Sequence, residues 1–227
     1  MNRKISIIVM LFLAVLLSGA ELKTAENGIA FGSAKLNIWD SGIMSLTDKQ
    51  GLFTSWYFHF TTKHPGKWFS MSHKSCKLQK LPAENGTWKF KAAVPVTETE
   101  TADAEMTLAA TPFNTVEIEC TWKCADPKNI LETGFFLSLP VKASEGGKME
   151  INGKEYPIVN ETKYGWFKSS LENPEFRIYP GNPLREYTIS ARGKYNITIG
   201  TVKNGSVTIR IIAPRGSNNM KLTFTPR

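Results

Sequence analysis

The sequence has few of the residues that metal proteins and most enzymes use for chemistry. Its 227 residues include 3 histidines and 3 cysteines, with no Cys-x-x-Cys pair and no Cys/His spacing typical of zinc. The acidic stretch 98–105 lacks the Asp-x-Asp-x-Asp-Gly order of calcium loops, so we interpret it as an exposed strand end. After residue 20 no segment shows the period of an amphipathic helix. We expect no cofactor and a β-rich fold.

The cysteines leave the disulfide question open. On a strand, Cys120 and Cys124 would have α-carbons roughly 13 Å apart, beyond disulfide reach. Cys76 could pair with either one. Alternation in VEIECTWKC places Cys120 on the apolar face with Ile118 and Trp122, which indicates a buried small hydrophobic residue.

Residues 1–20 have the order of a secretory signal. Arg3 and Lys4 precede the apolar run 5–17, and the small residues Ser18 to Ala20 follow. The run is short for a membrane span, and Ala20 stands where a lipoprotein would need cysteine. We expect cleavage after Ala20, no stable membrane insertion afterwards, and a periplasmic or extracellular protein, with a short signal typical of bacteria.

The net charge is basic but scattered. Removing Arg3 and Lys4 lowers the formal charge from +8 to +6. An anionic polysaccharide or a cell surface would suit this charge, but dispersed lysines are more typical of a surface kept in solution than of nucleic-acid binding. We expect no nucleic-acid partner and leave the oligomeric state open.

Short alternating segments separated by Gly, Pro, Asn and Asp predict strands throughout residues 21–227. Asn152-Gly153 and Asn204-Gly205 are typical of type I′ hairpin turns. The fold class that fits is all-β: one antiparallel two-sheet β-sandwich domain, supersandwich or jelly-roll-like, after the signal peptide. The expected strands are 28–39, 42–47, 52–62, 67–81, 87–96, 104–111, 114–123, 130–140, 147–151, 154–159, 164–169, 175–179, 185–191, 195–202, 206–213 and 220–225.

The aromatic stretch 55–69 divides into two faces when it is read as a hairpin. If Pro65-Gly66 forms a two-residue turn, residues whose numbers sum to 131 pair, so Phe60 meets Met71. One face then holds only apolar side chains and predicts core: Trp56, Phe58, Phe60, Phe69 and Met71. Trp88 and Phe90 share a strand face and are also expected in the core.

The other face of this hairpin is the candidate binding site. Tyr57, His59 and Trp68 lie there among Ser, Thr and Lys, with Lys63 as a polar contact. Rings beside hydroxyls and amines suit sugars, which stack their C–H faces and hydrogen-bond through their hydroxyls. Trp166, beside Tyr164 and Lys168, is a further candidate. A partly buried second layer, or a cation–π pair between Lys63 and Trp68, would explain the same residues without a ligand.

Signals for catalysis are weak. Glu117 and Glu119 have the i, i+2 spacing that could flank a glycosidic bond, but their strand has an apolar opposite face, so a solvated face explains them better. The Glu-x-Asp-x-x-Glu signature of laminarinase-like jelly rolls and the Tyr-x-Lys-Ala-Gly type motif of jelly-roll alginate lyases are absent.

Three late segments carry a family resemblance: FFLSLPV at 135–141, MEINGKEYPI at 149–158, and YNITIG with VTIRIIAP within 195–214. The chain resembles the non-catalytic β-sandwich modules of secreted bacterial carbohydrate-active proteins, and is similar also to galactose-mutarotase-type supersandwich domains. The resemblance covers about half of the mature chain and implies contact with glycans. Mutarotase catalysis implies a His and Glu pair in a concave sheet, which no positions of the sequence identify.

The leading hypothesis is therefore non-catalytic carbohydrate binding by an exported β-sandwich, through Tyr57, His59, Lys63, Trp68 and Trp166. Two alternatives stay open: a polysaccharide lyase or hydrolase whose catalytic pair forms only in three dimensions, and a structural or adhesion module that binds another protein.

Overall fold

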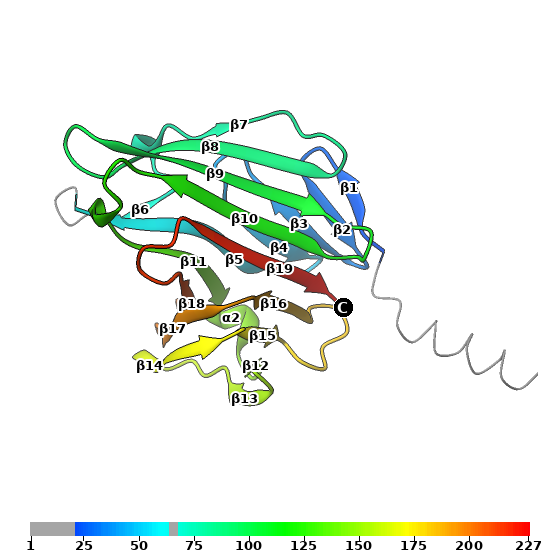
Figure 1. Ribbon diagram of the computed structural model, residues 1–227. Helices are drawn as coiled ribbons and strands as arrows, with labels where there is room; N and C mark the ends of the chain where they lie inside the picture. The colour runs from blue at the N-terminus through cyan, green and yellow to red at the C-terminus, as the bar shows by residue number, and fades with distance from the viewer. Residues whose placement is uncertain (1–20, 64–67) are drawn as a thin grey trace, which may run out of the picture.

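The computed structural model describes residues 21–63 and 68–227. Two antiparallel sheets form the molecule, and they lie face to face (Figure 1). The helices are short: η1 (Lys74–Cys76), η2 (Pro127–Asn129) and α2 (Val141–Ser144). Within the described ranges, no helix has the length and apolar character needed to cross a membrane. The predicted all-β, two-sheet sandwich is confirmed.

The ten-stranded sheet has the order β1–β2–β3–β4–β5–β11–β18–β17–β14, with β6 paired to β5 off this path. Its strands are β1 (Lys23–Ala25), β2 (Gly28–Phe31), β3 (Ala34–Ile38), β4 (Met44–Asp48), β5 (Gly51–Thr62), β6 (Trp68–Ser70), β11 (Ile130–Pro140), β14 (Lys163–Glu172), β17 (Lys194–Thr201) and β18 (Ser206–Ile212). One side of the long β5 is shared, since β4 pairs with its first half and β6 with its second.

The nine-stranded sheet has the order β13–β12–β15–β16–β19–β10–β9–β8–β7. Its strands are β7 (Gln79–Lys80), β8 (Thr87–Pro95), β9 (Thr101–Ala110), β10 (Val116–Lys123), β12 (Lys148–Ile151), β13 (Lys154–Pro157), β15 (Glu175–Ile178), β16 (Tyr187–Ala191) and β19 (Asn219–Pro226). The strand β19 lies between β16 and β10 and so joins the two halves of this sheet.

The core fills the space between the sheets, because successive side chains of a strand point to opposite faces. Trp56 of β5 lies fully buried, its ring centroid 5.6 Å from Phe224 of the facing sheet and 6.2 Å from Phe135. Every residue predicted for the core face of the aromatic hairpin is buried, as are Trp88 and Phe90. Alternation therefore assigned the inner faces correctly.

The pairing within the aromatic hairpin differs from the prediction by two residues. His59 lies opposite Ser70 and Thr61 opposite Trp68, so paired numbers sum to 129 rather than 131. The parity is unchanged, and the faces therefore remain as predicted. Pairing ends at Thr61 and Trp68, too early for a two-residue turn; Pro-Gly favours turn types whose twist does not match a tight hairpin. The predicted turn at 64–67 lies outside the described residues.

Other turn predictions had mixed outcomes. Asn152 and Gly153 have φ of 47° and 77° between Ile151 and its partner Lys154, which confirms the type I′ pattern. At Asn204-Gly205 only Asn204 has positive φ, and the Gly205 N–H donates to the Val202 carbonyl, so a longer connection replaces the expected turn.

Two expected strands are interrupted. Residues 28–39 form the hairpin of β2 and β3, which turns at Gly32 with φ 54°. Residues 67–81 form β6, η1 and β7.

All three cysteines are free. The Cys76 thiol donates to the Ser70 carbonyl at 3.4 Å, and burial raises its pKa to about 11. Cys120 is fully buried next to Met71, which confirms its interpretation as a small core residue. Neither of the pairings left open for Cys76 forms, because each thiol has a separate environment.

Candidate ligand-binding face

The outer face of the ten-stranded sheet carries an aromatic cluster, defined here as Tyr57, His59, Trp68 and Phe136. On β5, Tyr57 and His59 point away from the core because their neighbours point into it. Phe136 of β11 is in register with Tyr57. Trp68 of β6 lies on the other side of β5. The fold thus brings three of the five predicted site residues together.

The rings of the aromatic cluster pack on one another. Tyr57 stacks on Phe136 with centroids 5.5 Å apart and planes 12° apart, and His59 stacks on Trp68 at 5.6 Å and 26°. Trp68 also meets Tyr57 and Phe136 edge to face, at 5.8 and 5.5 Å. Trp68 is nevertheless 43% exposed. The cluster is therefore a preformed platform with one largely open ring.

His59 points to the outer face but has no exposed surface. Trp68 and Phe136 cover it, and Gly134 of β11 leaves the space that its ring occupies. A Cβ at Gly134 would lie 2.7 Å from His59 Cε1 and 2.8 Å from the Ile211 carbonyl oxygen. This burial lowers the pKa of His59, because the charged imidazolium is poorly solvated there.

Glu132 connects the aromatic cluster to a cation. His59 Nε2 lies 3.2 Å from Glu132 Oε1, and Arg210 Nη2 contacts the same oxygen. The hydrogen bond from His59 and the Arg210 charge hold the pKa of Glu132 below its usual value, against the effect of its partial burial. The Arg210 guanidinium also lies 5.1 Å from the Phe136 ring centroid, a cation–π contact. Glu132 is thus a carboxylate already engaged on two sides.

A hollow of about 680 Å³ with many polar side chains in its lining adjoins this ion pair, and we call it the outer-face hollow. Phe136 is in register with Arg210, Arg210 with Thr198 of β17, and Thr198 with Lys168 of β14. This row crosses strands spaced roughly 4.8 Å apart, and leads from the rings to the hollow. The hollow's polar lining comprises Glu132, Lys168, Ser169, Ser170, Asn196, Thr198 and Arg210.

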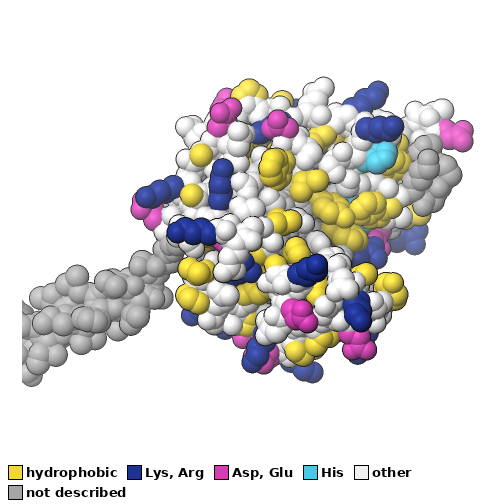
Figure 2. Space-filling model, turned by 180° about the vertical axis from the view of Figure 1, so that it is seen from behind, with side chains coloured by type: hydrophobic (Ala, Val, Ile, Leu, Met, Phe, Trp, Pro, Cys, Tyr) yellow, Lys and Arg dark blue, Asp and Glu magenta, His cyan; other side chains and the backbone are white. Residues whose placement is uncertain are grey.

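Figure 2 turns the outer face of the ten-stranded sheet toward the viewer. Hydrophobic side chains gather on its right-hand side in this view, and Lys and Arg side chains are scattered around the whole outline of the molecule. An apolar patch next to cations is a surface suited to a ligand with both apolar and polar parts.

The other two predicted site residues, Lys63 and Trp166, do not take part in the ring contacts of the aromatic cluster. Trp166 packs with Tyr156 at 5.8 Å, donates from Nε1 to Thr201 Oγ1, and lines a separate small pocket of about 190 Å³. Lys63 follows β5 and is exposed. Among the described residues, the cation–π contact considered between Lys63 and Trp68 is absent; Arg210 over Phe136 is found instead. A role for Lys63 and Trp166 in binding stays a prediction.

Sequence reasoning missed Phe136, Glu132 and Arg210. In the run FFLSLP, Phe135 points into the core and Phe136 outward. Two consecutive phenylalanines do not reveal which ring faces outward. That assignment requires the register in which β11 pairs with β5. The pairing of β11 with β5 also shifts by one residue between Ile130 and Glu132, so simple alternation along the strand does not predict where the Glu132 carboxylate points. The one available signal was Arg210, a charged residue within the apolar stretch VTIRII.

The site can stack a ring and form hydrogen bonds around it. Within residues 21–63 and 68–227, no group of three His, Cys, Asp or Glu side chains is placed to hold a metal ion. Tyr57 is half-buried, and desolvation raises the pKa of its hydroxyl, so it stays protonated at neutral pH. The ionised carboxylate of the site is Glu132, and His59 and Arg210 already engage it.

Neither a known protein family nor a curated protein matches the sequence. Among solved structures, the chain is similar to a GalM/aldose epimerase homologue from C. elegans, with a TM-score of 0.46 and 9% identity over 92% of this chain and 98% of that one. It is also similar to an alpha-mannosidase from Enterococcus faecalis V583, with a TM-score of 0.45 and 10% identity over 92% of this chain and 30% of that one.

Proposed function

We propose that this protein is exported and binds carbohydrate on the outer face of its ten-stranded sheet. The observation that carries the proposal is the aromatic cluster, which is fixed by its own packing and borders the outer-face hollow. Export rests on the signal-like order of residues 1–20.

Sugar rings match this combination of groups. Their C–H faces pack on exposed aromatic rings, and Trp68 offers such a ring. Their hydroxyls need nearby donors and acceptors, which Asn196, Thr198 and Ser170 supply in the hollow. Because the rings already hold one another in place, little side-chain entropy is lost on binding.

The surroundings of His59 and Tyr57 support a binding role for these two residues rather than a role as general bases. General-base catalysis by His59 or Tyr57 would need that side chain to reach a substrate in its basic form. His59 lies beneath Trp68 and Phe136 and is hydrogen-bonded to Glu132. The raised pKa of Tyr57 keeps its hydroxyl protonated. Neither side chain is therefore placed as a general base.

Affinity electrophoresis through a panel of polysaccharides tests the proposal, with Trp68→Ala and Phe136→Ala as site variants. Trp39→Ala is the matched control, since Trp39 is 56% exposed and lies outside the cluster. We expect wild type and Trp39→Ala to be retarded by the same glycan and both site variants to migrate freely, with near-UV circular dichroism showing intact folding. Retardation of Trp68→Ala equal to wild type, or no retardation of wild type by any glycan, would refute it.

A further inference from the structure

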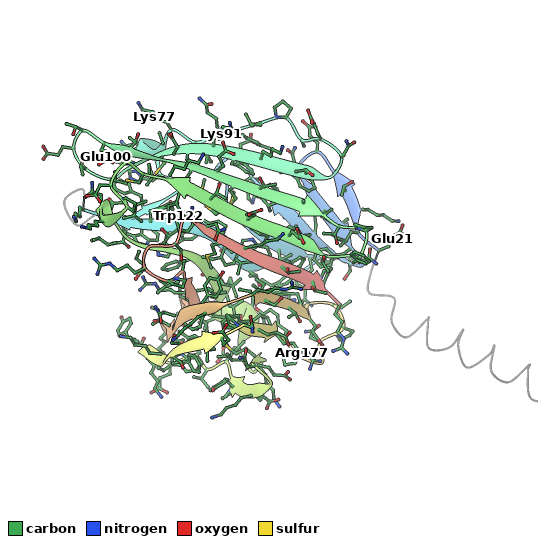
Figure 3. The ribbon with its side chains drawn as sticks, viewed as in Figure 1. Glu21, Lys77, Lys91, Glu100, Trp122 and Arg177 are labelled. Atoms are coloured by element: carbon green, nitrogen blue, oxygen red, sulfur yellow. The ribbon has the colours of Figure 1, made fainter. Side chains whose placement is uncertain are left out.

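A second hollow, of about 540 Å³, opens at one end of the sandwich, and we call it the end hollow. It lies where β10 ends, β11 begins and residues 213–218 connect β18 to β19. Trp122, labelled in Figure 3 next to this connection, lines it. Ser217 and Asn218 add hydrogen-bonding groups.

The two hollows adjoin. Glu132, Asn196 and Ile212 line both of them. Asn196 and Ile212 are paired on neighbouring strands, and Ile212 is paired with Gly134 on its other side. The two hollows therefore form one continuous surface. It runs from the outer face of the ten-stranded sheet, past the shared residues Glu132, Asn196 and Ile212, to the end of the sandwich. A surface of this extent suits a chain of several sugars better than one sugar.

Charge along this path is mostly positive. Lys168 and Arg210 line the outer-face hollow, and Lys123 and Arg215 line the end hollow. Glu132 is the one carboxylate among the lining residues of both, and Arg210 and His59 already engage it. In the described ranges, no ion pair involves Lys123, Lys168 or Arg215.

Acidic groups near the end hollow are occupied elsewhere. Glu100 accepts hydrogen bonds from the Asn129 amide, the Asp126 backbone N–H and the Cys124 thiol. The Asp126 carboxylate caps η2 through the Lys128 N–H. Neither Glu100 nor Asp126 lines the hollow. Among the described residues, Lys123, Lys168 and Arg215 thus have no carboxylate partner, while Arg210 stays paired with Glu132.

We propose that the ligand is an anionic sugar polymer, with a carboxylate or sulfate on successive units, lying across both hollows. This inference rests on the proposed function and specifies its ligand class. One unit packs on Trp68 and Phe136 and places its anionic group on Arg210, which lies over Phe136. Neighbouring sugar units in the outer-face hollow contact Lys168. Sugar units that extend past Glu132 into the end hollow contact Lys123 and Arg215. Charge and hydroxyl recognition thereby follow one continuous path.

Calorimetry with three hexasaccharides tests this: an oligogalacturonate, a sulfated glucan oligomer and cellohexaose, with the disaccharide of each as the short ligand. The variants are Lys168→Gln and Lys123→Gln/Arg215→Gln. Lys89→Gln/Lys91→Gln is the control, because it removes the same charge as the double variant from the outer face of the opposite sheet, where Figure 3 labels Lys91.

At physiological salt we expect at least one anionic hexamer to bind about tenfold more tightly than cellohexaose, since charged hydrogen bonds add this much. Lys123→Gln/Arg215→Gln weakens the hexamer about tenfold but leaves the disaccharide within about twofold, because only the hexamer reaches the end hollow. Lys168→Gln weakens the anionic ligands and not cellohexaose. Whichever of the two anionic hexamers binds, the oligogalacturonate or the sulfated glucan, identifies the anionic group that the protein recognises.

Three results would overturn the inference. Cellohexaose binding as tightly as both anionic hexamers, with Trp68→Ala abolishing it, would leave carbohydrate binding intact but remove the anionic class. Equal weakening by the Lys89/Lys91 control would show unspecific attraction to a basic protein. Absence of binding by every oligosaccharide, with the protein folded, would refute the proposed function as well.

Discussion

Burial of His59 beneath Trp68 and Phe136 makes the protein's stability depend on pH in a defined window. The pKa of His59 in the folded protein lies below the usual 6.5, mainly because burial disfavours its charge. Below pH 6.5 the unfolded chain therefore binds a proton that the folded protein does not. Over the pH range where this difference holds, the free energy of unfolding falls by up to about 1.4 kcal/mol for each unit by which the pH is lowered.

The neighbouring carboxylate acts in a lower window. The pKa of Glu132 is held below its usual 4.5 by the hydrogen bond from His59 and by Arg210. Its stabilisation is present above pH 4.5 and is lost as the pH falls from there through the lowered pKa. The range just below pH 6.5 thus reports on His59 rather than on Glu132. Tyr57, whose pKa is raised, does not ionise there.

Urea unfolding, followed by tryptophan fluorescence between about pH 5 and pH 8, measures this effect. His59→Gln keeps a donor for Glu132 and removes the titration, and exposed His73→Gln is the matched control. We expect stability to decline toward acid in wild type and His73→Gln, and to decline less in His59→Gln, whatever its stability at pH 8. Parallel curves for wild type and His59→Gln would refute the reasoning.

Three further predictions concern the frame around the site. Asp48→Asn breaks a mostly buried ion pair whose Arg185 Nε lies 2.7 Å from Asp48 Oδ2; we expect a loss of about 3 kcal/mol in urea unfolding, and a loss below about 1 kcal/mol would mean that solvent screens the pair. Gly134→Ala meets His59 and a backbone oxygen and should cost about 1–3 kcal/mol by overpacking; an unchanged urea midpoint would contradict the close packing. Thiol labelling of the native protein should modify half-buried Cys124 first, with Cys76 and Cys120 reacting only after denaturation; fast labelling of all three would contradict their burial.

At the aromatic stretch 55–69, the alternation of side chains along a strand was enough to predict which residues face the core. It separated Phe58 and Phe60, which are buried between the sheets, from Tyr57 and Trp68 on the outer face. Period two is a local property, so it survives an error of two residues in the hairpin register. The face of each side chain could therefore be predicted even where its partner could not.

Residues brought together by distant pairing were beyond such reasoning. Arg210 reaches Glu132 because β18 pairs with β11, and Glu132 reaches His59 because β11 pairs with β5. No local pattern encodes those neighbours. Burial of His59 also depends on Gly134, whose missing side chain creates the space for its ring. The sequence placed His59 on the right face but could not show that other rings cover it.

The position of β19 bears on how the chain reaches its folded state. Val116 of β10 pairs with Phe224 of β19, and β16 pairs with the opposite edge of β19. Until residues 219–226 pair with β10, the β8–β9–β10 meander has an unpaired edge strand whose inner face is apolar. Such an edge is prone to associate with other chains.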